Sequence, residues 1–142
     1  MGLDQLAPGL TCQRSIRVTE ALTVPAMAHA YPSLAEMPPV FATSFMIAFI
    51  EWTCVEALRP YLLPHQHTVG IHVDVSHKAA TPIGMQVTAD VELIEIEKRR
   101  LRFKVYCRDE IDDIGSGFHD RAVIDQEKFL LRVQNKAGPQ QA

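Results

Sequence analysis

The sequence has few cysteines, and the three present form no recognisable site pattern. Cys12, Cys54 and Cys107 lie far apart, are odd in number and include no Cys-x-x-Cys pair. This spacing predicts neither a zinc site nor a disulfide framework, so we expect no bound metal. Free thiols of this kind are typical of proteins in a reducing cytosol.

The sequence also lacks an excess of basic residues and a long apolar run. Its 14 Lys and Arg against 17 Asp and Glu give a net charge of −3, which favours neither nucleic acid nor an anionic membrane as a partner. The first ten residues lack the basic region and apolar run of a signal peptide. The longest apolar stretch, residues 41–50, is too short to span a bilayer. We therefore expect a cytoplasmic protein with no nucleic-acid or membrane partner.

The length of 142 residues suits a single domain. We expect one domain over residues 1–142, with an ordered core at about residues 12–135. The first ten residues and residues 136–142 are expected to be frayed, as chain ends often are.

The hydrophobic pattern predicts one strand, one helix and then strands only. Residues 42–62 are apolar nearly all round, which is typical of a helix buried by a sheet. Thr43 or Ser44 is the candidate cap, and Pro60 marks the expected end. Period-two alternation predicts strands in the following segments: 12–21, 69–75, 87–93, 101–107 and 119–133. The fold class is therefore α+β, an antiparallel sheet wrapped around one long central helix. One sheet covers only part of such a helix, so we expect a homodimer.

Residues 25–39 form an irregular, partly apolar connection with four prolines. Proline removes backbone donors and disfavours helix just before it. A long connection of this kind is uncommon unless it covers something. It is either a lid over a binding site or a loop packed as a satellite core.

Glu51 is the most informative residue, because it places a carboxylate on an apolar helical face. Ser44, Ile47, Val55 and Leu58 share that face. A carboxylate there needs a raised pKa or a fixed cationic partner, and such carboxylates serve as general bases or nucleophiles. The alternative is a helix-surface glutamate paired with an arginine.

Thr43 and His77 each have a structural and a functional interpretation. The Thr43 hydroxyl either caps the helix or lies beside free backbone donors that stabilise an oxyanion. His77 is in phase with the apolar set 69–75 and points toward the helix, as a core histidine or as a catalyst. His72 has the opposite phase, and we expect it to face solvent.

Other candidates are weaker. His119 and Arg121 share one strand face, and an inward arginine binds an anion or forms a structural ion pair. Residues 98–100 (Lys-Arg-Arg) form a turn that either meets phosphates or is a solvated hairpin tip. We interpret Cys54, one turn beyond Glu51, as a core residue.

Three segments carry a family resemblance: VFATSFMIAFIEWTCVEALRPYL, VSHKAATPIG and IGSGFHDRAVIDQEKF. In this order they resemble the fluoroacetyl-coenzyme A thioesterases and their relatives, a branch of the hotdog superfamily, over about residues 16–133. The resemblance implies a hotdog fold and hydrolysis of an acyl-coenzyme A thioester. It implies no cofactor, since coenzyme A is part of the substrate.

The resemblance also assigns roles to residues. It implies that Thr43 binds the thioester oxygen, that Glu51 acts as nucleophile or as base for water, and that His77 supports proton transfer. Gly70 matches the family's glycine near the acyl group, and Arg121 matches its active-site arginine.

The sequence departs from the family's pattern in the candidate lid, residues 25–39. Leu34 and Met37 stand where the fluoroacetyl-specific member has two phenylalanines, so we expect a short-chain thioesterase that is not strictly fluoroacetyl-specific. One alternative is a hotdog dehydratase or hydratase, which needs an aspartate–histidine pair near the helix start, and residues 42–50 contain neither. Another is a non-catalytic acyl-thioester binding protein.

Overall fold

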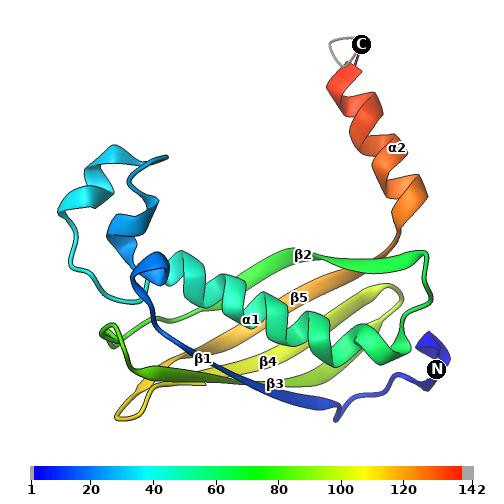
Figure 1. Cartoon of the computed structure of the whole chain (residues 1–142). Helices are drawn as coiled ribbons and strands as arrows, with labels where there is room; N and C mark the ends of the chain where they lie inside the picture. The colour runs from blue at the N-terminus through cyan, green and yellow to red at the C-terminus, as the bar shows by residue number, and fades with distance from the viewer. Residues whose placement is uncertain (1, 139–142) are drawn as a thin grey trace.

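The computed structural model describes residues 2–138 and contains a five-stranded antiparallel sheet that curves around one helix (Figure 1). The strand order across the sheet is β1-β3-β4-β5-β2, so β1 and β2 form its edges. The strands are β1 (Thr11–Arg17), β2 (Gln66–Val75), β3 (Gln86–Glu97), β4 (Arg100–Arg108) and β5 (Asp113–Asp125). The α+β class predicted from the hydrophobic pattern is confirmed.

Helix α1 (Thr43–Leu58) lies across the concave face of the sheet and continues into a short 3-10 helix, η5 (Arg59–Tyr61). Pro60 lies in that last turn, as expected for a helix end. The predicted cap is wrong. Ala42 is the N-cap residue and makes no side-chain cap hydrogen bond, while Thr43 is already the first helical residue.

The core is the space between α1 and the inward face of β3 and β4. Alternate residues of these strands are buried: Val87, Ala89, Val91, Leu93, Leu101, Phe103, Val105 and Cys107. They pack with the buried face of α1, which includes Met46, Ile50 and Cys54. The alternation predicted for these two strands, and the core position of Cys54, are confirmed.

Strand β2 departs from the regular alternation that we predicted. Its pairing with β5 shifts between Gly70 and His72, so Ile71 forms a bulge. A bulge of one residue reverses which side chains face the core. Gly70 pairs with the inward residue Arg121, whereas beyond the bulge Val73 pairs with the buried His119. The prediction that alternate residues 69, 71, 73 and 75 all point toward the helix is therefore wrong for the part of the strand before the bulge.

The final segment is a strand followed by a helix, and the prediction of a strand to residue 133 is wrong. Strand β5 ends at Asp125, and α2 (Gln126–Ala137) follows. The Asp125 carboxylate accepts a hydrogen bond from the Lys128 backbone N–H, which is the usual way an aspartate starts a helix. Helix α2 extends away from the sheet beyond its β2 edge (Figure 1).

The N-terminal residues contribute to the core, so the prediction that all ten are frayed is wrong. Leu6 is buried among core residues after the short 3-10 helix η1 (Leu3–Gln5). The Gly9 N–H donates a hydrogen bond to the Leu93 carbonyl. At the other end, residues 136–137 belong to α2, and residues 139–142 lie outside the described residues.

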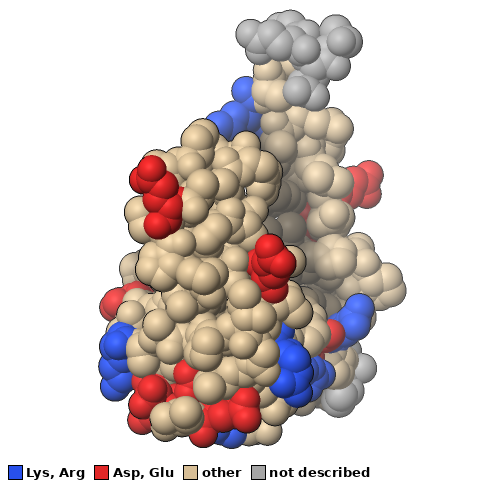
Figure 2. Space-filling model, turned by 60° about the vertical axis from the view of Figure 1, so that its left-hand side comes forward, with Lys and Arg blue, Asp and Glu red and all other residues tan. Residues whose placement is uncertain are grey.

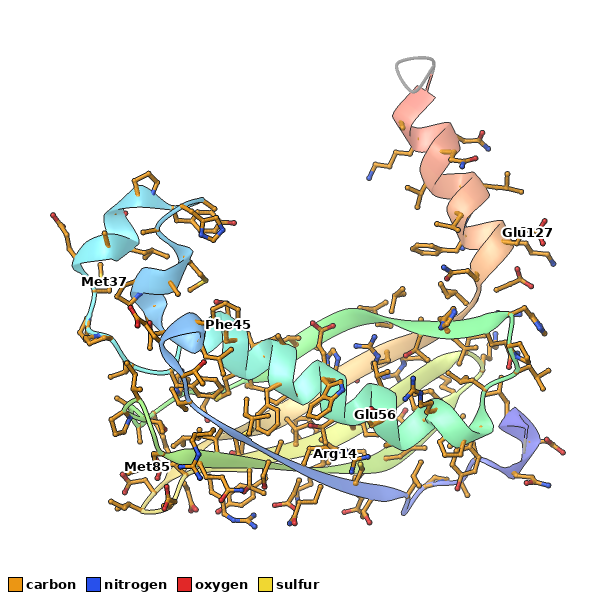
Figure 3. All side chains as sticks on the ribbon, in the orientation of Figure 1. Arg14, Met37, Phe45, Glu56, Met85 and Glu127 are labelled. Atoms are coloured by element: carbon orange, nitrogen blue, oxygen red, sulfur yellow. The ribbon has the colours of Figure 1, made fainter. Side chains whose placement is uncertain are left out.

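Residues 25–39, called the lid segment from here on, project from the N-terminal end of α1 beyond the sheet (Figures 1 and 3). They follow η2 (Glu20–Leu22) and fold as part of η3 (Val24–Met27) and as η4 (Pro32–Glu36). From residue 29 to residue 39 every side chain except the half-buried Leu34 is exposed. The lid segment is therefore not a satellite core of its own chain. None of the helices within residues 2–138 has the length and apolar character needed to cross a membrane.

Candidate active site

Glu51 and Arg121 form an ion pair between the middle of α1 and the inward face of β5. Arg121 Nη1 donates to Glu51 Oε2 over 3.0 Å, and the two side chains are 6% and 41% exposed, respectively. The fixed cationic partner expected for a carboxylate on this face is therefore present. Because the arginine is buried and the carboxylate is half exposed, the pair holds Glu51 in place while leaving it open to a ligand.

The Arg121 guanidinium is fixed on every side by hydrogen bonds. Its Nε donates to Thr68 Oγ1 over 2.8 Å, and its Nη2 donates to the Thr68 carbonyl over 2.9 Å. Nη1 also lies 3.1 Å from His119 Nε2. Since a guanidinium only donates, His119 Nε2 must be the acceptor. A guanidinium held this firmly gives the Glu51 carboxylate one preferred position.

His119 is a fully buried member of this network that the sequence analysis did not assign to the site. Its Nδ1 lies 2.8 Å from the His72 carbonyl oxygen, to which it donates. With one nitrogen donating and the other accepting, the ring is neutral and its tautomer is fixed. Burial lowers the pKa of His119, in agreement with this arrangement. The pairing of His119 with Arg121 two residues on was visible in the sequence, but the bulge that brings the His72 carbonyl to it was not.

Gly70 lies directly beside the carboxylate. A Cβ atom at this position would come within 2.7 Å of Glu51 Oε2 and 3.2 Å of His119 Cε1. Real Cβ atoms do not approach so closely, so any side chain would displace the carboxylate. The structure thus brings together Glu51, Arg121 and Gly70, three of the predicted site residues.

Thr43 and His77 form a second group at the N-terminal end of α1. Thr43 Oγ1 and His77 Nδ1 lie 2.7 Å apart and share a hydrogen bond. The hydroxyl therefore serves the imidazole and does not cap the helix. His77 Nε2 is buried and has no hydrogen-bond partner among residues 2–138. Burial lowers the pKa of His77, because loss of contact with water disfavours the charged form of the ring.

The helix start beside Thr43 offers backbone donors. The N–H of Met46 makes the first intrahelical hydrogen bond, to the Ala42 carbonyl. The backbone N–H groups of residues 43–45 precede it and have no helical acceptor. These donors, the helix dipole and the Thr43 hydroxyl together suit a developing negative charge on a carbonyl oxygen.

The two groups are separated along the helix. Thr43 and Glu51 are eight residues apart, which is about 12 Å along the helix axis. One thioester carbonyl therefore cannot contact both the oxyanion donors and the carboxylate of the same chain.

The lid residues Leu34 and Met37 have no hydrogen bond or ion pair to the two groups in the described chain. Leu34 is half buried within the lid segment, and Met37 is 44% exposed. The lid segment is nevertheless anchored at the site, because the Ser44 hydroxyl donates to Met27 Sδ over 3.1 Å. Ser44 follows Thr43, so one end of the lid segment is held at the start of α1.

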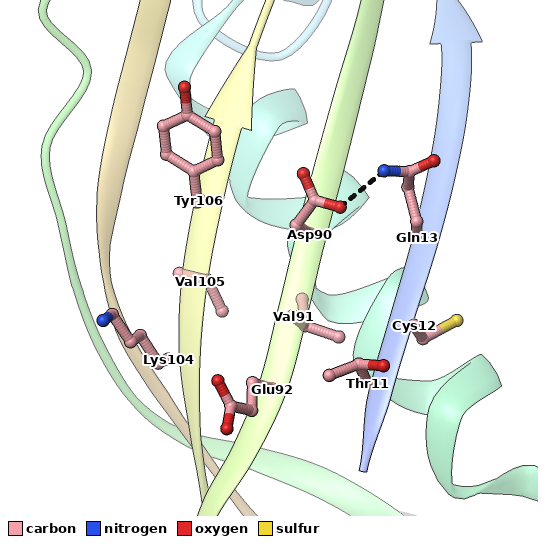
Figure 4. Close-up of a pocket in the computed structure, with 9 residues that line it drawn as sticks. All are labelled: Thr11, Cys12, Gln13, Asp90, Val91, Glu92, Lys104, Val105 and Tyr106. Atoms are coloured by element: carbon pink, nitrogen blue, oxygen red, sulfur yellow. Dashed lines mark hydrogen bonds between the residues drawn. The ribbon is translucent and has the colours of Figure 1, made fainter. Parts of the chain in front are cut away.

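Two other features do not belong to the site. Arg100, in the basic turn at residues 98–100, is already paired with Glu95, Glu97 and Asp120. An open groove on β1, β3 and β4 is lined mainly by outward polar side chains, among which Gln13 donates to Asp90 (Figure 4). It contains none of the predicted catalytic residues. Within the described part of the chain, no three His, Cys, Asp or Glu side chains gather as a metal site would require.

Comparison with known proteins agrees with this geometry. A family model described as "Fluoroacetyl-CoA-specific thioesterase" matches residues 18–127. The chain is 46% identical over 126 residues to a fluoroacetyl-CoA thioesterase of Streptantibioticus cattleyicolor, covering 84% of this chain and 91% of that protein.

Solved structures give the same result. A variant of the fluoroacetyl-CoA-specific thioesterase in complex with fluoroacetate and CoA superposes with a TM-score of 0.85 at 44% identity, covering 87% of this chain and 99% of that one. A hot-dog-like protein from Thermanaerovibrio acidaminovorans has a TM-score of 0.81 at 20% identity, covering 95% and 96%. The second likeness identifies the fold as a hotdog, and the first identifies the family. The chain therefore belongs to the fluoroacetyl-CoA-specific thioesterase family and is a thioester hydrolase.

Proposed function

We propose that this protein hydrolyses short-chain acyl-coenzyme A thioesters, with Thr43, Glu51 and His77 as its catalytic residues. The observation that carries the proposal is the Glu51–Arg121 pair. A buried guanidinium holds one carboxylate oxygen, Gly70 has no side chain that would displace the carboxylate, and the Glu51 side chain stays 41% exposed. A carboxylate fixed but accessible in this way is suited to attack a carbonyl or to activate water.

Each group has a defined task in the proposed reaction. The Thr43 hydroxyl and the free N–H groups at the start of α1 bind the thioester oxygen as it becomes negative. Either Glu51 attacks the carbonyl carbon, or Glu51 takes a proton from a water that attacks it. Because Thr43 and Glu51 of one chain lie about 12 Å apart along α1, the Glu51 that meets this carbonyl is that of the partner subunit in the proposed dimer. The carbon–sulfur bond then breaks, and coenzyme A leaves as a thiol after taking up a proton. If Glu51 was the nucleophile, water hydrolyses the resulting acyl–glutamate anhydride to the free acid. His77, neutral and bonded to Thr43, is placed to move protons at this end.

Arg121 and Gly70 act beside these residues. Arg121 positions Glu51, and Gly70, which we place beside the acyl group, has no side chain that would displace the Glu51 carboxylate. Leu34 and Met37 line the lid above the acyl group. Methionine is flexible and adapts to varied shapes, so we propose a pocket that accepts acetyl and somewhat larger groups with weak preference for fluoroacetyl.

We further propose a homodimer formed through strand β2, with the active sites near the interface. Strand β2 is a ten-residue edge with unpaired backbone groups. Ile71 and Val73 on it are exposed, as is Trp52 on α1. Pairing of β2 with its copy would extend the sheet and cover these residues. Sedimentation should give a dimer at micromolar concentration, and a stable monomer would contradict the proposal.

Thiol release from a panel of acyl-coenzyme A substrates tests the reaction. Acetyl, propionyl, butyryl and fluoroacetyl thioesters should each release coenzyme A, and fluoroacetyl should lead by much less than a thousandfold. Binding of the panel without thiol release would instead identify an acyl-thioester binding protein. A shift of the acyl double-bond absorbance without thiol release, using an unsaturated thioester, would identify a hydratase.

A further inference from the structure

Helix α2 leaves the domain with an uncovered apolar face. It has 12 residues, none of them buried. At 100° per residue, Phe129, Leu130 and Val133 fall on one face, while Leu131 falls on the opposite one. Leu130 and Val133 are 46% and 49% exposed, respectively. A helix of this length is marginal in water by itself, so an unpaired apolar face indicates a docking surface.

The lid segment presents a second uncovered apolar surface. Tyr31 and Met37 on it are exposed, and Glu36 is the only residue with a formal charge in residues 25–39. In Figure 2, where this part of the molecule comes forward, its surface is mostly uncharged. The lid segment and α2 both project past the β2 edge of the sheet, at opposite ends of that edge (Figure 1).

Hydrogen bonds fix the two segments at opposite ends of β2. The root of α2 lies at the beginning of the strand, where Asp125 pairs with Gln66 and the Gln126 N–H donates to the His65 carbonyl over 2.9 Å. The lid segment is anchored beyond the end of the strand, where the Phe41 N–H donates to the Thr81 carbonyl over 2.9 Å. Ten residues of strand span about 33 Å. Within one chain, therefore, α2 does not reach the lid segment.

A two-fold dimer changes this relation. Antiparallel pairing of β2 with its copy lays the beginning of one strand beside the end of the other, and keeps both copies of α1 on the same face of the sheet. The root of α2 then lies at the end of the sheet that carries the partner's lid. We infer that the apolar face of α2 packs on the lid segment of the partner subunit, so that each lid is supported in trans. This inference rests on the proposed dimer.

The charges of the two segments fit this pairing. Lys128, Arg132 and Lys136 recur every four residues along α2, beside its apolar face, against one acid, Glu127. The lid segment contributes the opposite charge at Glu36. Such complementarity favours this pairing over contact between two copies of α2, which would repel one another.

Cross-linking between two differently tagged chains tests the contact directly. One chain carries Val133→Cys and the other Met37→Cys, both with Cys12→Ser, since Cys54 and Cys107 are buried. After co-expression, a short bis-maleimide should yield a covalent dimer that contains both tags. The matched control is Leu131→Cys, on the opposite face of α2, which should link at least several-fold less.

Cross-linking and sedimentation together distinguish failure of the contact between α2 and the partner's lid segment from failure of the proposed dimer. A dimer in sedimentation with no link between positions 133 and 37, or with equal linking from position 131, overturns the contact alone. In a further variant, one chain carries both Val133→Cys and Met37→Cys. A cross-link formed within that single chain also overturns the contact between subunits. A monomer overturns the dimer together with the contact. Thiol release is not needed for any of these readouts.

A second pair of variants measures what the contact does. Val133→Lys should leave the dimer intact but increase protease cleavage of the lid segment about tenfold, as expected when a valine loses its apolar partner. The KM for acetyl-coenzyme A should rise with it. Leu131→Lys adds the same charge on the other face and should change neither. Equal effects of the two variants would show that α2 has no specific face and would overturn the inference.

Discussion

The two halves of the active site are held in opposite ways. Arg121 donates to Glu51, to His119 and twice to Thr68, so the carboxylate half is fixed by a closed network. The Thr43–His77 half shares one hydrogen bond, and the second nitrogen of His77 has no partner within residues 2–138. The carboxylate half is thus preorganised before substrate binds. The Thr43–His77 half is less constrained, so its hydroxyl is able to donate a hydrogen bond to a substrate oxygen and its imidazole to exchange a proton.

The largest effect should follow from removing the negative charge of Glu51, which the hydrogen-bond network of Arg121 holds in place. Glu51→Gln keeps the volume of the side chain but removes the nucleophile or base, so thiol release should fall by about 10³-fold or more. The variant should stay folded but melt at a lower temperature, because the buried Arg121 guanidinium loses its counter-charge. Glu56→Gln, on the same helix, is the matched control and should retain activity. Near-normal turnover of Glu51→Gln would remove this residue from the mechanism.

Loosening the network without touching Glu51 should have the next largest effect. His119→Leu removes the acceptor for Arg121 Nη1, so the guanidinium and the carboxylate lose their fixed position. We expect kcat to fall about 10- to 100-fold while KM changes little. His119→Gln, whose amide oxygen can accept a hydrogen bond, should recover part of the loss. A lower melting temperature with unchanged kcat would mean that His119 is only structural.

The lid segment comes next, because in the proposed function it covers the Thr43–His77 half of the site. Leu34→Phe with Met37→Phe should make the compartment more rigid and raise the preference for fluoroacetyl over acetyl thioester. The gain should be about tenfold, near the lower end of the about 1–3 kcal/mol that a small difference in an apolar pocket is worth. Catalytic efficiencies for the two substrates measure it. A preference of a thousandfold already present in the native chain would contradict the lid argument.

The smallest effect is on stability at acid pH, and both halves contribute to it. Burial lowers the pKa of His77 and of His119 from 6.5. The unfolded chain therefore binds more protons than the folded chain below pH 6.5, and stability falls as the pH drops through this range. Each histidine contributes at most about 1.4 kcal/mol per pH unit. Urea unfolding at pH 7.5 and pH 5.5 measures the fall, which His77→Asn and His119→Gln should each reduce. If the free energy of unfolding falls between pH 7.5 and pH 5.5 as much in both variants as in the native chain, the fold keeps neither ring neutral.

Much of this protein follows from the sequence. The apolar pattern around residues 43–58 predicts a buried helix, and the alternation in β3 and β4 predicts two central strands, because burial imposes periods of 3.6 and 2 on the chain. The same reasoning makes Glu51 a candidate, since a carboxylate on an apolar face needs an explanation. The choice of His77 over a core histidine came from the family resemblance alone.

Only the tertiary structure decided how these residues work together. The bulge at Ile71 turns Gly70 and the His72 carbonyl into the site, and a one-residue shift of register leaves no mark in the hydrophobic pattern. The partner of the Thr43 hydroxyl also had to come from the structure, because capping and pairing with His77 use the same atom. Helix α2 was missed because its side chains have no core to face, and the capping hydrogen bond of Asp125 is a local contact that outweighed the strand pattern. Side chains held by local periodicity are determined by the sequence, whereas those held by contacts 30 to 70 residues away are determined by the fold.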